Sequence, residues 1–258
     1  MILGPLPVRT RLTHGEGIEN YAIRHAQRNG TTVEQIENAL REAGVMPRSR
    51  ARRHPGRLQA WKQLGGLHDR AFEARLSIGG HPVIERALCL RCASGNQRVG
   101  RIPSIGWVCV AHRRWIGRDQ FDIRQLPELV AAERRFRSTL VSRGIHVGTP
   151  AMLAANECAS AGIALSTLEE RGARAGRHEY EMLIYPETVR IARLITRPSF
   201  KDWVQNPALP AEQRRDRVAS EIATTLFRTG QSHRRRRAAQ RIENTLRRLS
   251  RRGIEWLT

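Results

Sequence analysis

Four side chains able to bind a metal stand in two pairs within the stretch CLRCASGNQRVGRIPSIGWVCVAH, residues 89–112. Cys89 and Cys92 form the first pair, and Cys109 and His112 form the second, each with two residues between its members. Thiolates and imidazoles are the ligands that Zn²⁺ prefers, and structural zinc sites arrange four of them as a tetrahedron. Because a turn of this length lets both members of a pair reach one ion, the pattern predicts one zinc ion.

The predicted zinc has a structural role rather than a catalytic one. Four protein ligands leave no open position on the ion for an activated water molecule. The sixteen residues between the two pairs are enough for a small ribbon, with Pro103 and Gly106 to turn the chain. We therefore expect a zinc ribbon whose metal holds the fold together.

Other interpretations of these residues stay open at this point. The cysteines could instead be small buried apolar side chains, with His112 on the surface. His81 and His68 are nearby and could replace His112 as the fourth ligand. Cys158 lies far from the set, so we expect it to be a single buried cysteine.

The remaining motifs give little support for catalysis. The sequence has no glycine-rich loop followed by Lys-Ser or Lys-Thr, no nucleophile elbow, and no closely spaced acids suited to Mg²⁺. Glu169 and Glu170 fall at the start of an expected helix, where acids favour the helix dipole. We therefore expect no catalytic residues and a protein that is not an enzyme.

The charge of the chain points to a polyanionic partner. Its formal net charge is +21, from 45 basic and 24 acidic residues, and nucleic acid is the first candidate for such a partner. Only Lys62 and Lys201 are lysines, a bias that a GC-rich genome could produce, but that bias does not explain the excess of cations. With four cysteines, no long apolar run and no export-like start, we expect a cytoplasmic protein without a membrane anchor.

Two short helices are expected near the start of the chain. Thr13 with Glu16, and Thr31 with Glu34, have the spacing of capping boxes, and Asn29-Gly30 separates the two helices. Such a pair is either a helix-turn-helix or a plain helical hairpin. Two more short helices are expected over LQAWKQLGGLHDRAFEARL, broken at Gly65-Gly66.

Arginine clusters are the candidate nucleic-acid contacts. One occupies the stretch RSRARRHPGR, which we interpret as an exposed basic connector. The other covers an expected helix at 233–252, whose apolar stripe is Ala239, Ile242, Leu246 and Leu249. The predicted contacts are Arg48, Arg50, Arg52, Arg53, Arg57, Arg234, Arg235, Arg236, Arg237, Arg241, Arg247, Arg248, Arg251 and Arg252.

The second half of the chain is expected to be helical throughout. Leu129, Ala132, Phe136 and Leu140 have the spacing of one helix face, and Gly144 stands where that helix would stop. Further helices are predicted around 150–172, 180–196 and 211–229. The fold class is thus mainly α: a helix-turn-helix-like module with a zinc-ribbon insertion over residues 1–122, and a strongly basic helical region over 123–258.

The order of these features resembles the TniQ family, the target-selection proteins of certain bacterial transposons, related to TnsD. Over about residues 5–120, the chain matches three loose motifs of the family. The matched residues are Gly15-Glu16, Tyr21, Ala26 and Asn29-Gly30 in the first motif, Leu64, Gly66-Leu67, Leu76 and Ile78 in the second, and Trp107, Cys109 and His112 in the third.

This resemblance implies a non-catalytic adaptor for transposition. Such proteins recognise target DNA directly or through an RNA-guided targeting complex, and they recruit an AAA+ ATPase that brings the transposase. Some members form homodimers. Two rival hypotheses remain: a helix-turn-helix transcription regulator that reads DNA with residues 31–43 and has a structural zinc site, and an enzyme whose active site the motifs do not reveal.

Overall fold

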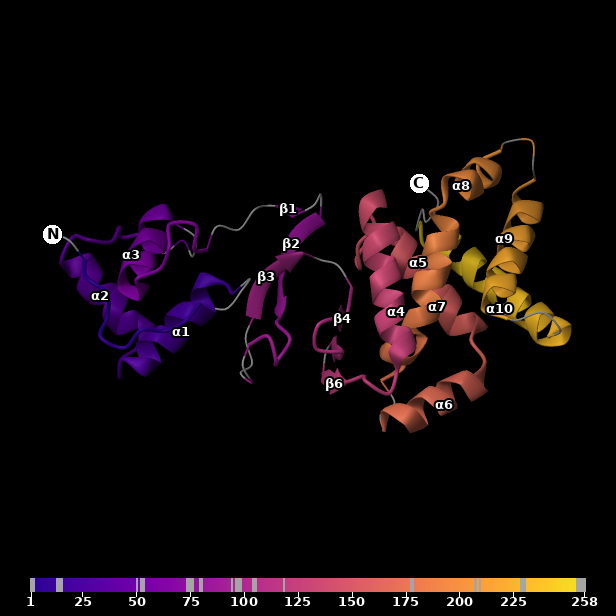
Figure 1. Cartoon of the computed structure of the whole chain (residues 1–258). Helices are drawn as coiled ribbons and strands as arrows, with labels where there is room; N and C mark the ends of the chain where they lie inside the picture. Colours follow the sequence, from indigo (N-terminus) through magenta and orange to yellow (C-terminus); the bar gives the residue numbers. More distant parts are fainter. Residues whose placement is uncertain are drawn as a thin grey trace. The chain divides into compact units, whose positions relative to one another are not determined.

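The protein is mainly helical, as predicted (Figure 1). The computed structural model describes residues 3–12, 16–49, 51, 54–72, 77–78, 81–93, 95, 99–103, 106–117, 119–176, 179–206, 208, 210–227 and 231–253. Two compact units divide the chain, an N-terminal unit of residues 1–78 and 82–103 and a C-terminal unit of residues 79–81 and 104–258.

Three helices build the core of the N-terminal unit. They are α1 (Ile18–Arg28), α2 (Val33–Glu42) and α3 (Pro55–Gly65). Their buried faces enclose Tyr21 and Trp61, which have no exposed surface, together with smaller apolar side chains such as Leu40 and Leu64. His25 is buried among them, and its ring nitrogens lie 3.0 Å from Thr10 Oγ1 and 2.9 Å from the Leu64 carbonyl oxygen.

The predicted start of α2 is wrong by one residue. Thr32 is the N-cap, with its hydroxyl accepting from the Gln35 N–H, and Gln35 Oε1 accepts in return from the Thr32 N–H. The predicted pair of Thr31 and Glu34 does not form because the Thr31 N–H is already used, donating to the Ala26 carbonyl at the end of α1. For α1 the N-cap is Gly17, and the predicted cap Thr13 lies outside the described residues.

Two small antiparallel sheets follow these helices. The first contains β1 (Ser77–Ile78), β2 (His81–Ala87) and β3 (Val99–Pro103) in that order, and β2 pairs with β3 from Val83↔Pro103 to Ala87↔Val99. The second contains β4 (Val108–Cys109), β5 (Arg114–Ile116) and β6 (Gln120–Asp122). The residues between the two metal-binding pairs thus contribute to both sheets.

The C-terminal unit begins earlier than the domain boundary predicted at residue 122. Val108 and Trp115, from β4 and β5, are completely buried in the same apolar core as the helices that follow. The Trp115 and Tyr185 rings meet edge to face, with centroids 5.5 Å apart. Burial of these large side chains explains why the second sheet belongs to the helical unit.

Helices make up the rest of the C-terminal unit. They are α4 (Pro127–Arg135), the π-helix η1 (Phe136–Leu140), the short 3₁₀-helix η2 (Val141–Arg143), α5 (Pro150–Gly162), α6 (Leu165–Ala175), α7 (Tyr180–Ile195), α8 (Pro198–Val204), α9 (Ala211–Leu226) and α10 (Ser232–Arg251). All four residues of the predicted stripe at 129–140 are buried, and Gly144 ends this segment with φ 73°. α7 packs against α4 and α5, and α10 packs against α5 and α9.

The apolar stripe of α10 covers this core largely as predicted. Ile242, Leu246 and Leu249 are buried, whereas Ala238 rather than Ala239 is the alanine that is completely enclosed. The helix places its arginines on the remaining faces. The strongly basic segment is therefore held in place mainly by apolar packing.

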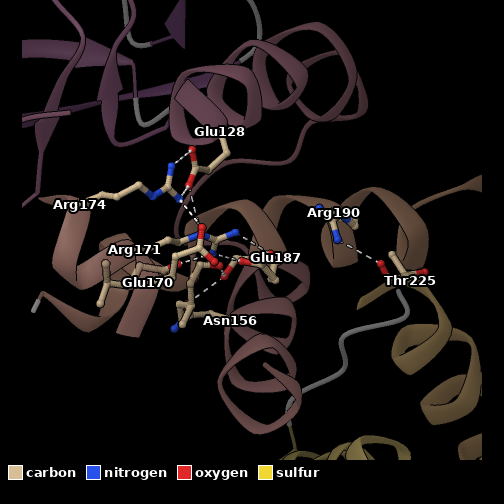
Figure 2. Close-up of polar contacts among 11 residues, drawn as sticks. Glu128, Asn156, Glu170, Arg171, Arg174, Glu187, Arg190 and Thr225 are labelled. Atoms are coloured by element: carbon tan, nitrogen blue, oxygen red, sulfur yellow. Dashed lines mark hydrogen bonds and ion pairs between the residues drawn. The ribbon is translucent and has the colours of Figure 1, made fainter. Parts of the chain in front are cut away.

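A buried ion pair supports α7 where Pro186 interrupts its hydrogen bonding. A proline cannot donate a backbone hydrogen bond inside a helix. Arg171, from α6, donates to the Leu183 carbonyl and to the Glu187 carboxylate, with Nη2 2.9 Å from Oε1 (Figure 2). Arg171 thereby joins α6 to α7 beside the proline. Glu128, on α4, also pairs with Arg171 and with Arg174.

Candidate metal centre

The structure brings together the four predicted metal ligands. One ligand atom from each of Cys89, Cys92, Cys109 and His112 lies within 4.8 Å of the other three. Cys109 Sγ and His112 Nδ1 are 3.6 Å apart. Tetrahedral zinc with bonds of about 2.3 Å to sulfur and about 2.0–2.1 Å to nitrogen puts these two atoms about 3.6 Å apart. The group could therefore hold one metal ion, and its ligand types and spacing are compatible with zinc.

A tight turn after β2 positions the first cysteine pair. The Ala93 N–H donates to the Cys89 carbonyl over 2.9 Å, and the Gly95 N–H donates to the Leu90 carbonyl over 2.7 Å. Gly95 has φ 82°, a conformation that glycine adopts without a Cβ clash. The turn buries Cys89 and leaves Cys92 exposed, so the pair offers one thiol from the interior and one from the surface.

The hairpin between β4 and β5 positions the second pair. Cys109 is paired in register with Arg114, and the four residues between them form the turn that carries His112. Arg113 closes this turn with φ 49°, a left-handed conformation that is uncommon outside glycine and asparagine. This turn returns the chain so that the imidazole lies beside the Cys109 thiol.

A buried carboxylate holds the strand that leads into Cys109. Glu133, on α4, has no exposed surface, and its Oε2 accepts hydrogen bonds from the backbone N–H groups of Trp107 and Val108 at 3.1 and 3.2 Å. Arg137 lies one turn further along the helical segment and donates from Nε to Glu133 Oε1 over 2.7 Å. These bonds fix the backbone one and two residues before a proposed metal ligand.

The sequence analysis missed Glu133, although a signal for it exists. Position 133 lies on the same side of the helix as the stripe of Leu129, Ala132, Phe136 and Leu140. A carboxylate within such a stripe is expected to be buried, and a buried charge needs partners. Glu133 could therefore have been recognised as the centre of a polar network, although its partners Trp107 and Val108 could not have been named.

The alternative ligands and the fourth cysteine are also placed. His68 is exposed and does not belong to the metal-competent group. Among the described residues, no other group of side chains could hold a metal ion in this way. The side chain of His81 lies outside the described residues. Cys158 is 1% exposed within α5, and burial raises the pKa of its thiol to about 12. It is a buried single cysteine, as predicted.

The arginines predicted to contact nucleic acid differ in their exposure in the structure. Arg50, Arg52 and Arg53 lie outside the described residues, and Arg48 is exposed. Arg57 was expected in an exposed connector, but it lies in α3 and is buried. Its Nε donates to Glu37 Oε1 over 2.7 Å, because the carboxylates of α1 and α2 need a cation in this core. That expectation for Arg57 is corrected.

The α10 arginines divide into paired and unpaired groups. Arg247 pairs with Glu243, and Arg248 pairs with Glu157, both at 2.6–2.7 Å. The others have no acidic partner within the part of the chain that the structure describes, and all except the half-buried Arg235 are exposed. These residues are Arg234, Arg235, Arg236, Arg237, Arg241, Arg251 and Arg252.

Comparisons with protein-family models, with curated proteins and with solved structures found no match for this chain. Within the described residues, no helix combines the length and the apolar character needed to cross a membrane.

Proposed function

We propose that this protein is a non-catalytic, DNA-associated adaptor whose Cys-His group binds one structural zinc ion. The observation that carries the proposal is the unpaired arginine surface of α10, on a helix fixed to the core by Ile242, Leu246 and Leu249. Cations held on a rigid element attract phosphates and release counterions when they bind. The net charge of +21 supports the same partner.

The surface of α2 favours this proposal over a transcription regulator that reads DNA with α2. The exposed residues of α2 include Glu34 and Glu42, and its one arginine, Arg41, donates to Glu37 Oε2 over 2.8 Å. An acidic helix surface is repelled by the phosphate backbone. DNA contact is therefore better supported at the arginines of the C-terminal unit than at α2.

The adaptor role in transposition rests on the resemblance to the TniQ family over residues 5–120. Such an adaptor joins target DNA, or an RNA-guided targeting complex, to an AAA+ ATPase and through it to the transposase. The acidic exposed face of α2 supports protein contact rather than DNA contact by the N-terminal unit. We therefore propose that the ATPase is bound by this unit.

Salt-dependent binding tests the DNA part of the proposal. Replacing Arg234, Arg235, Arg236 and Arg237 with glutamine should weaken binding to all DNA duplexes alike, because arginine–phosphate pairs carry no base information. The slope of log K against log salt should fall by up to about 0.9 for each phosphate that the variant no longer binds. An unchanged affinity and slope would show that this part of α10 does not touch DNA.

A pull-down of the full chain with an AAA+ transposition ATPase, sought first among the genes beside its own, tests the adaptor part. Capture should weaken for the variant Glu34→Lys/Glu42→Lys. The matched control is Glu212→Lys/Glu221→Lys in α9, which reverses two exposed acids in the C-terminal unit. Equal loss with both variants, or no capture by the wild type, would contradict the proposed ATPase contact.

A further inference from the structure

A hollow between α4 and α7 is lined by several arginines. Its volume is about 190 Å³, and its lining includes the small or apolar side chains of Ala131, Ala132, Pro186 and Val189. Four arginines also line it, from three different helices. They are Arg135 on α4, Arg171 on α6, and Arg190 and Arg193 on α7.

Two of these arginines already have polar contacts within the protein. Arg171 is committed to Glu187 and Glu128, and Arg190 donates from Nη1 to the Thr225 carbonyl over 3.2 Å (Figure 2). Glu128, the acid in the lining, is itself held by Arg171 and Arg174. Two cations already share the single negative charge of Glu128, so this carboxylate does not neutralise Arg135 and Arg193 as well.

Arg135 and Arg193 have no acidic partner among the residues that the structure describes. Arg193 is half-buried, and its Nε is enclosed without a hydrogen-bond partner. Burial lowers the pKa of Arg193, and repulsion by Arg135, Arg143 and Arg197 lowers it further. The protein thus keeps three further positive charges close to one partly desolvated guanidinium.

More cations lie beyond the hollow, next to Arg193, and together with the arginines of the hollow they form a cationic band. Arg143 donates from Nη1 to the Arg193 carbonyl and to Thr196 Oγ1 at 3.2 and 3.1 Å, which fixes its position beside the C-terminal end of α7. Arg143 also lines a second hollow of about 420 Å³ with Lys201 and with Asp202, the acid among its lining residues. Cations outnumber acids along the whole band.

The geometry points to a phosphodiester-binding groove formed by α4 and the arginines of α7, with Arg135 and Arg193 as its principal contacts. This inference rests on the proposed DNA association and adds a second binding surface to α10. Phosphate oxygens would give Arg193 an acceptor and would neutralise the repulsion around it.

The number of arginines gathered around Arg193 suits a polymeric ligand. Arg190 and Arg193 are three residues apart on α7, which is about 4.5 Å along the helix axis. Phosphates of one DNA strand repeat about every 3.4 Å along the duplex axis, so this length is close to one such repeat. A free phosphate would satisfy one arginine and leave the others repelling one another, whereas a strand supplies several phosphates at once.

Matched charge variants test the groove in the full-length protein. Arg135→Gln/Arg193→Gln removes two cations that lack acidic partners. The control Arg124→Gln/Arg215→Gln removes two cations that pair with Asp122 and Glu212. The net charge falls equally in both. Binding of a labelled, mixed-sequence DNA duplex is measured by fluorescence anisotropy over a range of salt concentrations, and the thermal midpoint of each variant is measured as a check of folding.

The groove variant should bind DNA about eightfold more weakly at 0.1 M salt for each phosphate that it no longer binds, because K varies with about the −0.9 power of salt per phosphate. Its thermal midpoint should not fall, since the substitution relieves repulsion around Arg193. The control should bind almost as the wild type does. Equal weakening in both variants, or a weakening seen with anionic lipid vesicles and not with duplex DNA, would overturn the inference.

The result separates this inference from the proposed function. If the wild type fails to bind duplex DNA, the proposed function fails as well. If the wild type binds and the α10 variant weakens that binding while Arg135→Gln/Arg193→Gln does not, only the groove is disproved.

Discussion

The Tyr185 hydroxyl donates a hydrogen bond to Glu133 Oε2 over 2.7 Å inside the core of the C-terminal unit. The same carboxylate oxygen accepts from the backbone N–H groups of Trp107 and Val108. Burial and the Glu133 charge raise the pKa of Tyr185 well above its ordinary value, so the phenol keeps its proton and remains a donor. One side chain on α7 thus helps to fix the backbone at Trp107 and Val108, which leads into Cys109.

Replacing Tyr185 with phenylalanine should destabilise the protein by about 1.5–3 kcal/mol, the usual contribution of a buried hydrogen bond to a charged group. The ring and its packing against Trp115 remain, so the change isolates the hydroxyl. Urea unfolding measures the free energy. Tyr180→Phe is the control, because Tyr180 is 43% exposed and water can replace its hydrogen bonds to Ser160. Equal destabilisation in the two variants would contradict a special role for the hydrogen bond to Glu133.

Gly106 should not tolerate a side chain. A Cβ at this position would lie 1.9 Å from Glu133 Oε1, and its φ of 54° is already unfavourable for other residues. Gly106→Ala should therefore lower the stability by more than Gly144→Ala, which has a φ of 73° but open space around it. Left-handed strain alone costs about 1–2 kcal/mol, so the excess at Gly106 measures the collision. Similar unfolding midpoints would show that Glu133 can move away.

The proposed zinc site gives a prediction for the cysteines. Cys109→Ser should abolish metal binding and reduce the yield of folded protein, because structural zinc can contribute on the order of 10 kcal/mol to a small module. Cys158→Ala should keep about one zinc per chain, since Cys158 lies outside the ligand group. Elemental analysis of both purified variants checks this. Wild-type protein that folds without metal would disprove the site.

Tyr21 should make the stability fall at alkaline pH. Burial raises the pKa of Tyr21 to about 12, and nearby Arg24 opposes part of the rise. Because the folded protein holds this proton more tightly than the unfolded chain does, the stabilising contribution is present below about pH 10 and is lost as the pH rises towards 12. Unfolding free energies measured between pH 9 and pH 12 should therefore fall less steeply in Tyr21→Phe. An identical slope in both proteins would contradict the shift.

The sequence was most informative where a local rule decides the outcome. Cysteine and histidine spacing predicted the metal-competent group, and helical periodicity predicted the buried stripe at 129–140 and, apart from Ala239, the stripe at 239–249. The predicted cap of α2 was wrong by one residue because the end of α1 uses the Thr31 N–H, an interaction between elements that no capping pattern includes. Arg57 was misplaced for a related reason, since its partner Glu37 comes from a different helix.

Several residues that match the TniQ motifs have structural roles in this chain. Asn29 binds both backbone polar groups of Val8, and Glu16 forms an ion pair with Arg24 at 2.6 Å. Tyr21 is completely buried. These interactions explain why such residue types suit the N-terminal unit, and they leave the choice of partner to the binding experiments. Long-range partners of this kind depend on the fold and cannot be obtained from spacing alone.

The crowding of arginines around Arg193 has a consequence for handling the protein. Most surface ion pairs weaken as ions are added, but here the added ions screen a repulsion. The C-terminal unit should therefore become more resistant to heat as sodium chloride is raised, and phosphate or sulfate should have a larger effect than chloride at equal ionic strength. A preparation freed of nucleic acid and kept in dilute buffer would be the form most prone to unfold.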